Sequence, residues 1–220
     1  MRLLLIHTGG SEGSVALADE GAVVAAEILP GRTSSELLVP VVRRLLSSLG
    51  WALGDLGAVG VVVGPGSFTG VRVGLSAAKG LVEAASVPLV GISRLELVAA
   101  VVGAGLVNAG LVHAVLDAGR GEFYYGRYLD GQRVEELLVK GDEIAALLEA
   151  GGVVVACEAK VVEALAGREL TVVPEPVAGA MVPLVLARME QGKFDDPMTL
   201  DANYLRQMDV EILARMRALQ

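Results

Sequence analysis

The sequence is poor in several residue types on which common protein functions depend. Cys157 is the only cysteine among its 220 residues, so the chain cannot form a disulfide within itself. There are two histidines, His7 and His113, and neither has a second histidine one helical turn away. A zinc or iron site needs three or four ligands, so the sequence predicts no metal site and argues against a metalloprotease.

Basic charge and aromatic side chains are also scarce. The formal net charge is −8, which argues against a protein that binds nucleic acid alone, so any nucleic acid would be held mainly by a partner. Aromatic residues make up 4% of the chain and hydrophobic residues 53%, which predicts a core built from aliphatic side chains. A chain of this length makes one domain or two small ones.

Long uninterrupted apolar runs are missing as well. The stretch 97–116 is long enough to span a membrane, but glycines, Asn108 and His113 interrupt it, and no basic residues flank it. The apolar run at residues 3–6 is far too short for a secretion signal. With a single cysteine, these features lead us to expect a cytoplasmic protein without a membrane partner.

A glycine-rich loop is the most distinctive local feature that is present. Residues 64–70 read Gly-Pro-Gly-Ser-Phe-Thr-Gly, between a β-branched run at 59–63 and an amphipathic stretch at 71–85. The pattern predicts a strand, a tight turn and a helix, with Ser67 and Thr69 as capping residues. Either the glycines serve only the geometry of the turn, or the loop and the helix N-terminus bind a phosphate. The loop matches neither the Walker pattern nor Gly-x-Gly-x-x-Gly.

Two predicted helices carry more apolar residues than one core-facing side requires. The helix at 34–49 follows a candidate capping box at 33–36 and contains Pro40. The helix at 68–85 has a second apolar stripe, formed by Val73, Ala77, Gly80, Leu81 and Ala84. Either all of these residues are internal, or one side of each helix binds a partner. We expect a partner interface formed by Leu37, Leu38, Val41, Leu45, Val71, Leu75, Ala78 and Val82.

The order of predicted elements repeats along the chain. The first half reads as strands at 3–7, 14–19 and 22–29, a helix at 34–49, a strand at 59–63, a helix at 68–85, a strand at 87–92 and a helix at 93–102. The second half reads as strands at 111–118, 122–129 and 132–139, a helix at 141–150, a strand at 153–156, a helix at 161–166, a strand at 171–173 and a helix at 178–191. His7 and Asp117 end the first strand of each half, and Gly21 and Gly131 close the first hairpins, both pairs 110 residues apart. This recurrence predicts two related α/β domains, each with a mixed sheet.

Candidate catalytic residues are few. Ser67 and Thr69 are hydroxyls on a turn, but no histidine lies near them in sequence to act as a base. His113 is interpreted as a core histidine bonded to a backbone group. Asp117 and Glu122 flank a glycine turn, and they are either ordinary turn residues or carboxylates that face a cleft between the domains. We therefore predict no catalytic residue.

Residues 64–74, Gly-Pro-Gly-Ser-Phe-Thr-Gly-Val-Arg-Val-Gly, resemble the signature of the bacterial TsaB family, also called YeaZ. The segments Leu38-Val39-Pro40, Asp117 to Tyr124 and Tyr204-Leu205-Arg206 are also similar to segments of that family. The resemblance covers roughly residues 1–207 and is thin from 132 to 195.

The resemblance implies an actin-like (ribonuclease H-like) fold with two related α/β domains. We place them at 1–103 and 104–207, where a late helix of the second could pack back on the first, and the sequence predicts a helical tail at 208–220. It further implies a non-catalytic subunit that pairs with TsaD and TsaE. That complex transfers threonylcarbamoyl from threonylcarbamoyl-AMP to the adenosine next to the anticodon of tRNA. By itself the chain would bind no cofactor and could form a homodimer. ATP or ADP could bind at a joint surface in the complex, and tRNA would bind only through the complex.

Two departures from the family pattern bear on an alternative function. The family usually has aspartate where this chain has His7, and arginine where it has Gly119, although Arg120 could substitute. A neutral histidine cannot replace a carboxylate beside Mg²⁺. The alternative is an ATPase or ATP-binding phosphotransferase of the actin-like superfamily, with Gly66, Ser67, Thr69 and Asp117 as phosphate or nucleotide contacts. Both departures weaken it.

Overall fold

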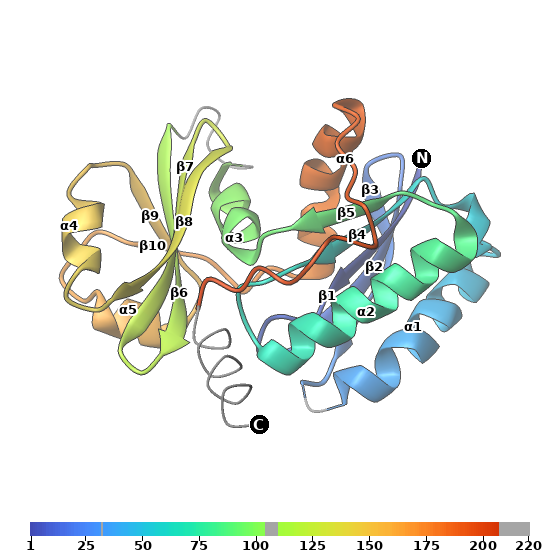
Figure 1. Ribbon diagram of the computed structural model, residues 1–220, viewed down its shortest axis with the longest axis horizontal. Helices are drawn as coiled ribbons and strands as arrows, with labels where there is room; N and C mark the ends of the chain where they lie inside the picture. The colour runs from blue at the N-terminus through green and yellow to red at the C-terminus, as the bar shows by residue number, and fades with distance from the viewer. Residues whose placement is uncertain (32, 104–109, 207–220) are drawn as a thin grey trace, which may run out of the picture.

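Two five-stranded mixed sheets form the framework of the protein. The computed structural model describes residues 1–31, 33–103 and 110–206. The first sheet has the strand order β3-β2-β1-β4-β5, and the second has the order β10-β9-β6-β7-β8. Read from its other edge, the second sheet has the order β8-β7-β6-β9-β10, in which the third, second, first, fourth and fifth strands of its half follow one another as they do in the first sheet. The predicted duplication and the actin-like α/β fold are therefore confirmed. Figure 1 shows the two sheets as separate lobes with α3 between them.

The first sheet contains β1 (Arg2–His7), β2 (Gly13–Asp19), β3 (Ala22–Leu29), β4 (Ala58–Val62) and β5 (Leu89–Ile92). The strands β1, β2 and β3 pair in antiparallel fashion, whereas β4 lies parallel to β1 and β5 lies parallel to β4. In β1, Leu4 and Ile6 face one core cluster and Leu3 and Leu5 face another. The strand is therefore buried on both faces, which accounts for its continuous apolar run.

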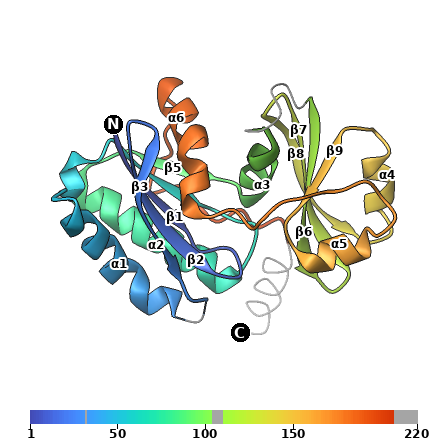
Figure 2. The ribbon, with the colours of Figure 1, turned by 180° about the vertical axis from the view of Figure 1, so that it is seen from behind.

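Helices cover both faces of the first sheet. On one face lie α1 (Ser34–Ser48) and α2 (Phe68–Ala85), side by side, with the short turn η1 (Leu53–Asp55) nearby. On the other face lie η2 (Ala178–Met181) and α6 (Val182–Glu190), although they come late in the chain (Figure 2). The chain thus returns to the first lobe after it has built the second.

The second sheet contains β6 (Leu111–Gly119), β7 (Glu122–Leu129), β8 (Gln132–Lys140), β9 (Val153–Ala156) and β10 (Thr171–Val172). The helices α4 (Ile144–Leu148) and α5 (Ala159–Ala164) pack on one face, and α3 (Arg94–Gly103) packs on the other. His113 is buried in β6, where its Nε2 lies 2.7 Å from the carbonyl oxygen of Gly151. The interpretation of His113 as a core histidine is confirmed.

Local sequence signals account for the turns better than for the helix starts. Gly21 and Gly131 have positive φ angles in the two predicted hairpin turns. The capping box at Thr33 is wrong, because its side chain makes no cap hydrogen bond and its hydroxyl donates to the carbonyl of Pro30 instead. The predicted helical tail at 208–220 lies outside the described residues.

Candidate functional site

The glycine-rich loop at 64–70 is bound to the turn that follows β1. The amide of Ser67 donates to the carbonyl of Gly9 over 2.9 Å, and the hydroxyl of Thr8 donates to the carbonyl of Gly70 over 2.7 Å. The side chain of Ser67 accepts a hydrogen bond from the amide of Gly70, so Ser67 caps α2 as predicted. Two amides of the loop therefore have partners within the chain.

Close packing of two backbone segments explains the glycines at the start of α2. A Cβ atom on Gly66 would stand 2.2 Å from the carbonyl oxygen of Gly9, and one on Gly70 would stand 1.9 Å from the carbonyl oxygen of Thr8. A Cβ on Gly74 would stand 2.2 Å from the hydroxyl oxygen of Thr8. The turn after β1 thus fills the space that these side chains would need, which favours the geometric interpretation of the loop.

The four candidate phosphate contacts do not converge on one cavity. Ser67 and Thr69 line a hydroxyl-rich cavity of about 140 Å³ between the starts of α1 and α2. Gly66 lines a different cavity of about 230 Å³. Asp117 belongs to the second lobe and lines neither cavity; its carboxylate lies 3.3 Å from the ammonium of Lys160.

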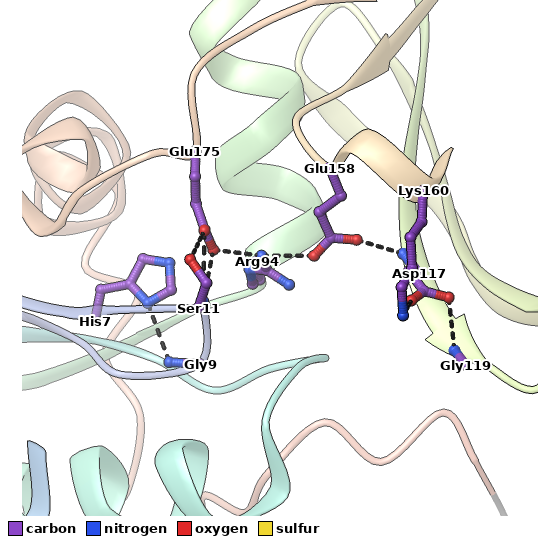
Figure 3. A network of polar contacts seen from close by, with 9 residues as sticks. All are labelled: His7, Gly9, Ser11, Arg94, Asp117, Gly119, Glu158, Lys160 and Glu175. Atoms are coloured by element: carbon purple, nitrogen blue, oxygen red, sulfur yellow. Dashed lines mark hydrogen bonds and ion pairs between the residues drawn. The ribbon is translucent and has the colours of Figure 1, made fainter. Parts of the chain in front are cut away.

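The space between the lobes holds an ionic network centred on Arg94, at the start of α3 (Figure 3). This buried guanidinium lies 2.9 Å from a carboxylate oxygen of Glu158 and 2.6 Å from one of Glu175. Glu158 also accepts a hydrogen bond from the amide of Asp117, and Glu175 accepts one from the hydroxyl of Ser11. The network therefore joins the turn after β1, helix α3 and the second sheet.

Polar contacts within this network shift the pKa values of Arg94 and Glu175 toward their charged forms. Burial alone would lower the pKa of Arg94, but the two glutamates outweigh it and raise that pKa. Burial alone would likewise raise the pKa of Glu175, but hydrogen bonds from Ser11 and the charge of Arg94 outweigh it and lower that pKa. Ser11 and Arg94 thus favour the charged form of Glu175, and the two glutamates hold the charge of Arg94 in a buried position.

His7 lies beside this network as a neutral side chain. Its Nδ1 accepts a hydrogen bond from the amide of Gly9 over 3.1 Å, whereas its buried Nε2 has no hydrogen-bond partner among the described residues. Burial, followed by the charge of Arg94, lowers the pKa of His7 to about 4. The residue that stands in place of the usual aspartate is therefore uncharged near neutral pH.

Most of the residues that we predicted as a partner interface on α1 and α2 are not exposed to solvent. Seven of the eight selected residues are buried in the core between these helices and the first sheet: Leu38, Val41, Leu45, Val71, Leu75, Ala78 and Val82. Only Leu37 is exposed. The selection is wrong for those seven residues, because a helix with two apolar stripes turns only one outward. The prediction that α1 and α2 bind a partner stays a prediction.

The second stripe of α2 is partly exposed at the border of the core, and apolar residues of the neighbouring α1 are also exposed. Val73, Ala77 and Leu81 are half-buried, and a Cβ atom on Gly80 would meet no described atom outside its own helix backbone within 4 Å. On α1, Leu37 and Val39 are 38% and 53% exposed. Val39 lines a shallow depression of about 400 Å³ together with Pro40, Arg43, Arg44 and Ser47. This set of exposed and partly exposed residues, Val39, Pro40, Val73, Ala77, Gly80 and Leu81, is called the α1–α2 surface below.

Sequence reasoning missed the residues that join the lobes. Arg94, Glu158 and Glu175 come from three separate segments, and no local pattern marks them as partners.

Among the described residues, no group of three or more histidine, cysteine, aspartate or glutamate side chains is arranged to hold a metal ion. Within the same part of the chain, no helix is both long and apolar enough to cross a membrane.

Comparison with known proteins adds a family to this geometry. Residues 27–182 match the family model described as tRNA N6-adenosine threonylcarbamoyltransferase (TsaD). The "tRNA threonylcarbamoyladenosine biosynthesis protein TsaB" of Escherichia coli is 39% identical over 150 residues, which are 68% of this chain and 63% of that protein. The protein of the same name in Bacillus subtilis is 36% identical over 129 residues, 58% of this chain and 55% of that protein. These matches thus span less than two thirds of either relative.

A solved structure covers more of the chain. The structure titled "YeaZ from Pseudomonas aeruginosa" is 28% identical, covers 93% of this chain and 99% of its own, and superposes with a TM-score of 0.77. The similarity therefore extends over both lobes. The chain belongs to the tRNA N6-adenosine threonylcarbamoyltransferase family, and within that family to the TsaB (YeaZ) group.

Proposed function

We propose that this chain is a non-catalytic subunit of the machinery that forms threonylcarbamoyladenosine in tRNA. In this proposal it pairs with a TsaD-like transferase, and the pair receives a TsaE-like protein. The names of its relatives support a role in that biosynthesis. The observation that carries the subunit role is the α1–α2 surface, where apolar side chains are exposed or partly exposed on two neighbouring helices.

The shape of the α1–α2 surface suits a helical partner. The small residues Ala77 and Gly80 allow a second helix to approach α2 closely, while Val39 of α1 and the partly exposed Leu81 of α2 supply apolar area. Exposed apolar side chains that cluster over adjacent elements are typical of interfaces. A second copy of this chain could use the same surface when the transferase is absent.

The network around Arg94 favours a supporting role over a catalytic one. An actin-like ATPase needs room between its lobes for nucleotide phosphates and a carboxylate beside the metal. In this chain Arg94, Glu158 and Glu175 lie between the lobes, and the neutral His7 takes the place of that carboxylate. We therefore propose that any ATP or ADP binds at a joint surface of the complex. Because this chain is acidic, we also propose that other subunits make most of the contacts with tRNA.

A titration calorimetry experiment with a TsaD-like protein of the same organism tests the proposal. We expect the native chain to bind, and Val39→Asp and Leu81→Asp to weaken the affinity at least about tenfold, because each would bury a charge against an apolar partner. Val172→Asp is the matched control, since Val172 is 59% exposed on β10 in the other lobe. Equal affinity of all four proteins would exclude the α1–α2 surface as the interface.

The alternative function, an ATPase or ATP-binding phosphotransferase, has one observation in its favour. The cavity lined by Ser67 and Thr69 lies where the N-termini of α1 and α2 meet, and helix N-termini attract anions. Titration of the isolated chain with Mg-ATP separates the two functions. The subunit proposal predicts no heat of binding at millimolar nucleotide, whereas the alternative predicts saturable binding that is lost in Ser67→Ala.

A further inference from the structure

A cavity of about 230 Å³ opens where the two lobes meet the C-terminal segment 202–206. Val63, Pro65 and Val71 line its first-lobe side, and Tyr124 of β7 lines the other. Phe68 and Tyr204 also line it, and they are 47% and 38% exposed. The cavity is smaller than the usual range of about 300 to 1,000 Å³ for small-molecule sites, and it is large enough for one bulky side chain.

Arg72 lies against both exposed rings. Its guanidinium carbon is 3.7 Å from the centroid of the Phe68 ring and 5.5 Å from that of the Tyr204 ring. Its Nε donates a hydrogen bond to the hydroxyl of Tyr204 over 2.6 Å. These contacts fix the planar guanidinium in one orientation, so little side-chain entropy remains to be lost on binding.

The charge of Arg72 is not balanced within the described part of the chain. No carboxylate there lies within ion-pair distance of it. The arginine that lines the cavity itself, Arg206, is already held by the carboxylate of Glu122 and the carbonyl of Ala118. A ligand would therefore meet an apolar cavity beside one oriented, unbalanced guanidinium.

We propose that this cavity and Arg72 bind a protein partner that inserts one large apolar side chain next to a carboxylate. The carboxylate would pair with the terminal nitrogens of Arg72, and the apolar side chain would lie between Phe68, Tyr204 and Tyr124. Oriented arginine and aromatic side chains around a pocket are typical of the residues that dominate protein interfaces. Single-stranded RNA also stacks on aromatic rings, but the net charge of −8 favours a protein. The proposal is independent of the α1–α2 surface.

NMR titration of the isotope-labelled full chain with short capped peptides tests this proposal. The probe is Ac-Gly-Asp-Phe-Gly-NH₂, with Asp→Asn and Phe→Ala peptides as controls and a five-nucleotide single-stranded RNA as the competing class. We expect the first peptide to shift resonances of Phe68, Tyr124 and Tyr204. Its affinity should fall about threefold to tenfold when the carboxylate is removed from the peptide or when Arg72→Gln removes the guanidinium.

Two further variants separate binding from folding. Arg43→Gln removes an exposed arginine from α1 and should bind the peptide as the native chain does. Tyr204→Phe keeps the ring but releases Arg72, so it should weaken binding without changing the melting temperature by more than a few degrees. The proposal is overturned if the Asp and Asn peptides bind equally, if neither binds, or if the RNA alone shifts these resonances.

Discussion

Gly70 and Thr8 make a backbone contact that leaves no room for a side chain. The hydroxyl of Thr8 donates a hydrogen bond to the carbonyl of Gly70. The carbonyl oxygen of Thr8 stands 1.9 Å from the position that a Cβ atom on residue 70 would take. The contact joins the first turn of α2 to the end of β1. It fixes the direction in which α2, and with it the α1–α2 surface, leaves the sheet.

Gly70→Ala should therefore destabilise the protein. The added methyl group cannot fit without a shift of backbone, and overpacking of this kind typically costs about 1 to 3 kcal/mol. Gly80→Ala is the matched control, because Gly80 lies in the same helix and a Cβ atom added there would contact no described atom outside its own helix backbone within 4 Å. It should stabilise the chain by about 0.5 to 1 kcal/mol, since alanine favours helix over glycine. Urea unfolding of both variants measures the difference; similar free energies of unfolding would contradict the packing role of Gly70.

Arg94→Met should lower stability more than any exposed arginine substitution. It leaves Glu158 and Glu175 half-buried without their cation, and loss of one partner from a buried ion pair typically costs about 3 kcal/mol or more. Arg43→Met should change the free energy of unfolding by less than about 0.5 kcal/mol, because Arg43 is exposed. If both substitutions proved equally mild, the network would not hold the lobes together.

Stability should fall as the pH is lowered from 6.5 toward 4 because of His7. The unfolded chain takes up a proton near the ordinary histidine pKa of 6.5, whereas the folded chain resists until about pH 4. The unfolded state thus binds more protons in that window, so acid favours it, by up to about 3 kcal/mol for a shift of this size. His7→Asn keeps an acceptor for the amide of Gly9 and should flatten the profile between pH 4 and 6.5. An unchanged profile would exclude His7 as its cause.

A second loss of stability should follow at lower pH because of Glu175. Its pKa is lowered in the folded state, so the stability that it contributes is present above the unfolded pKa near 4.5 and is lost as the pH falls below it. Glu175→Gln should remove this part of the acid unfolding curve while His7→Asn leaves it in place. If His7→Asn also removed this part of the curve, the two groups would not titrate in separate windows.

The elements that are determined locally could be predicted from the sequence. The hairpin turns at Gly21 and Gly131 and the bounds of α2 follow from glycine position and helical periodicity. The partly exposed stripe of α2 could not be identified, because Val71 and Val73 begin stripes of similar hydrophobicity, and only the position of the sheet decides which one is buried. The network of Arg94, Glu158 and Glu175 was also beyond prediction, since its members meet only when the two lobes pack.

The most direct measurement of the central claim is the formation of threonylcarbamoyladenosine in a reconstituted reaction, read by mass spectrometry of tRNA nucleosides. The mixture contains threonylcarbamoyl-AMP, tRNA, and TsaD-like and TsaE-like proteins of the same organism. The proposal predicts no product from this chain alone, little product without it, full product when it is added, and a strong loss with Val39→Asp but not with Val172→Asp. Product formed by this chain alone, or equally well in its absence, would contradict its role as a required non-catalytic subunit.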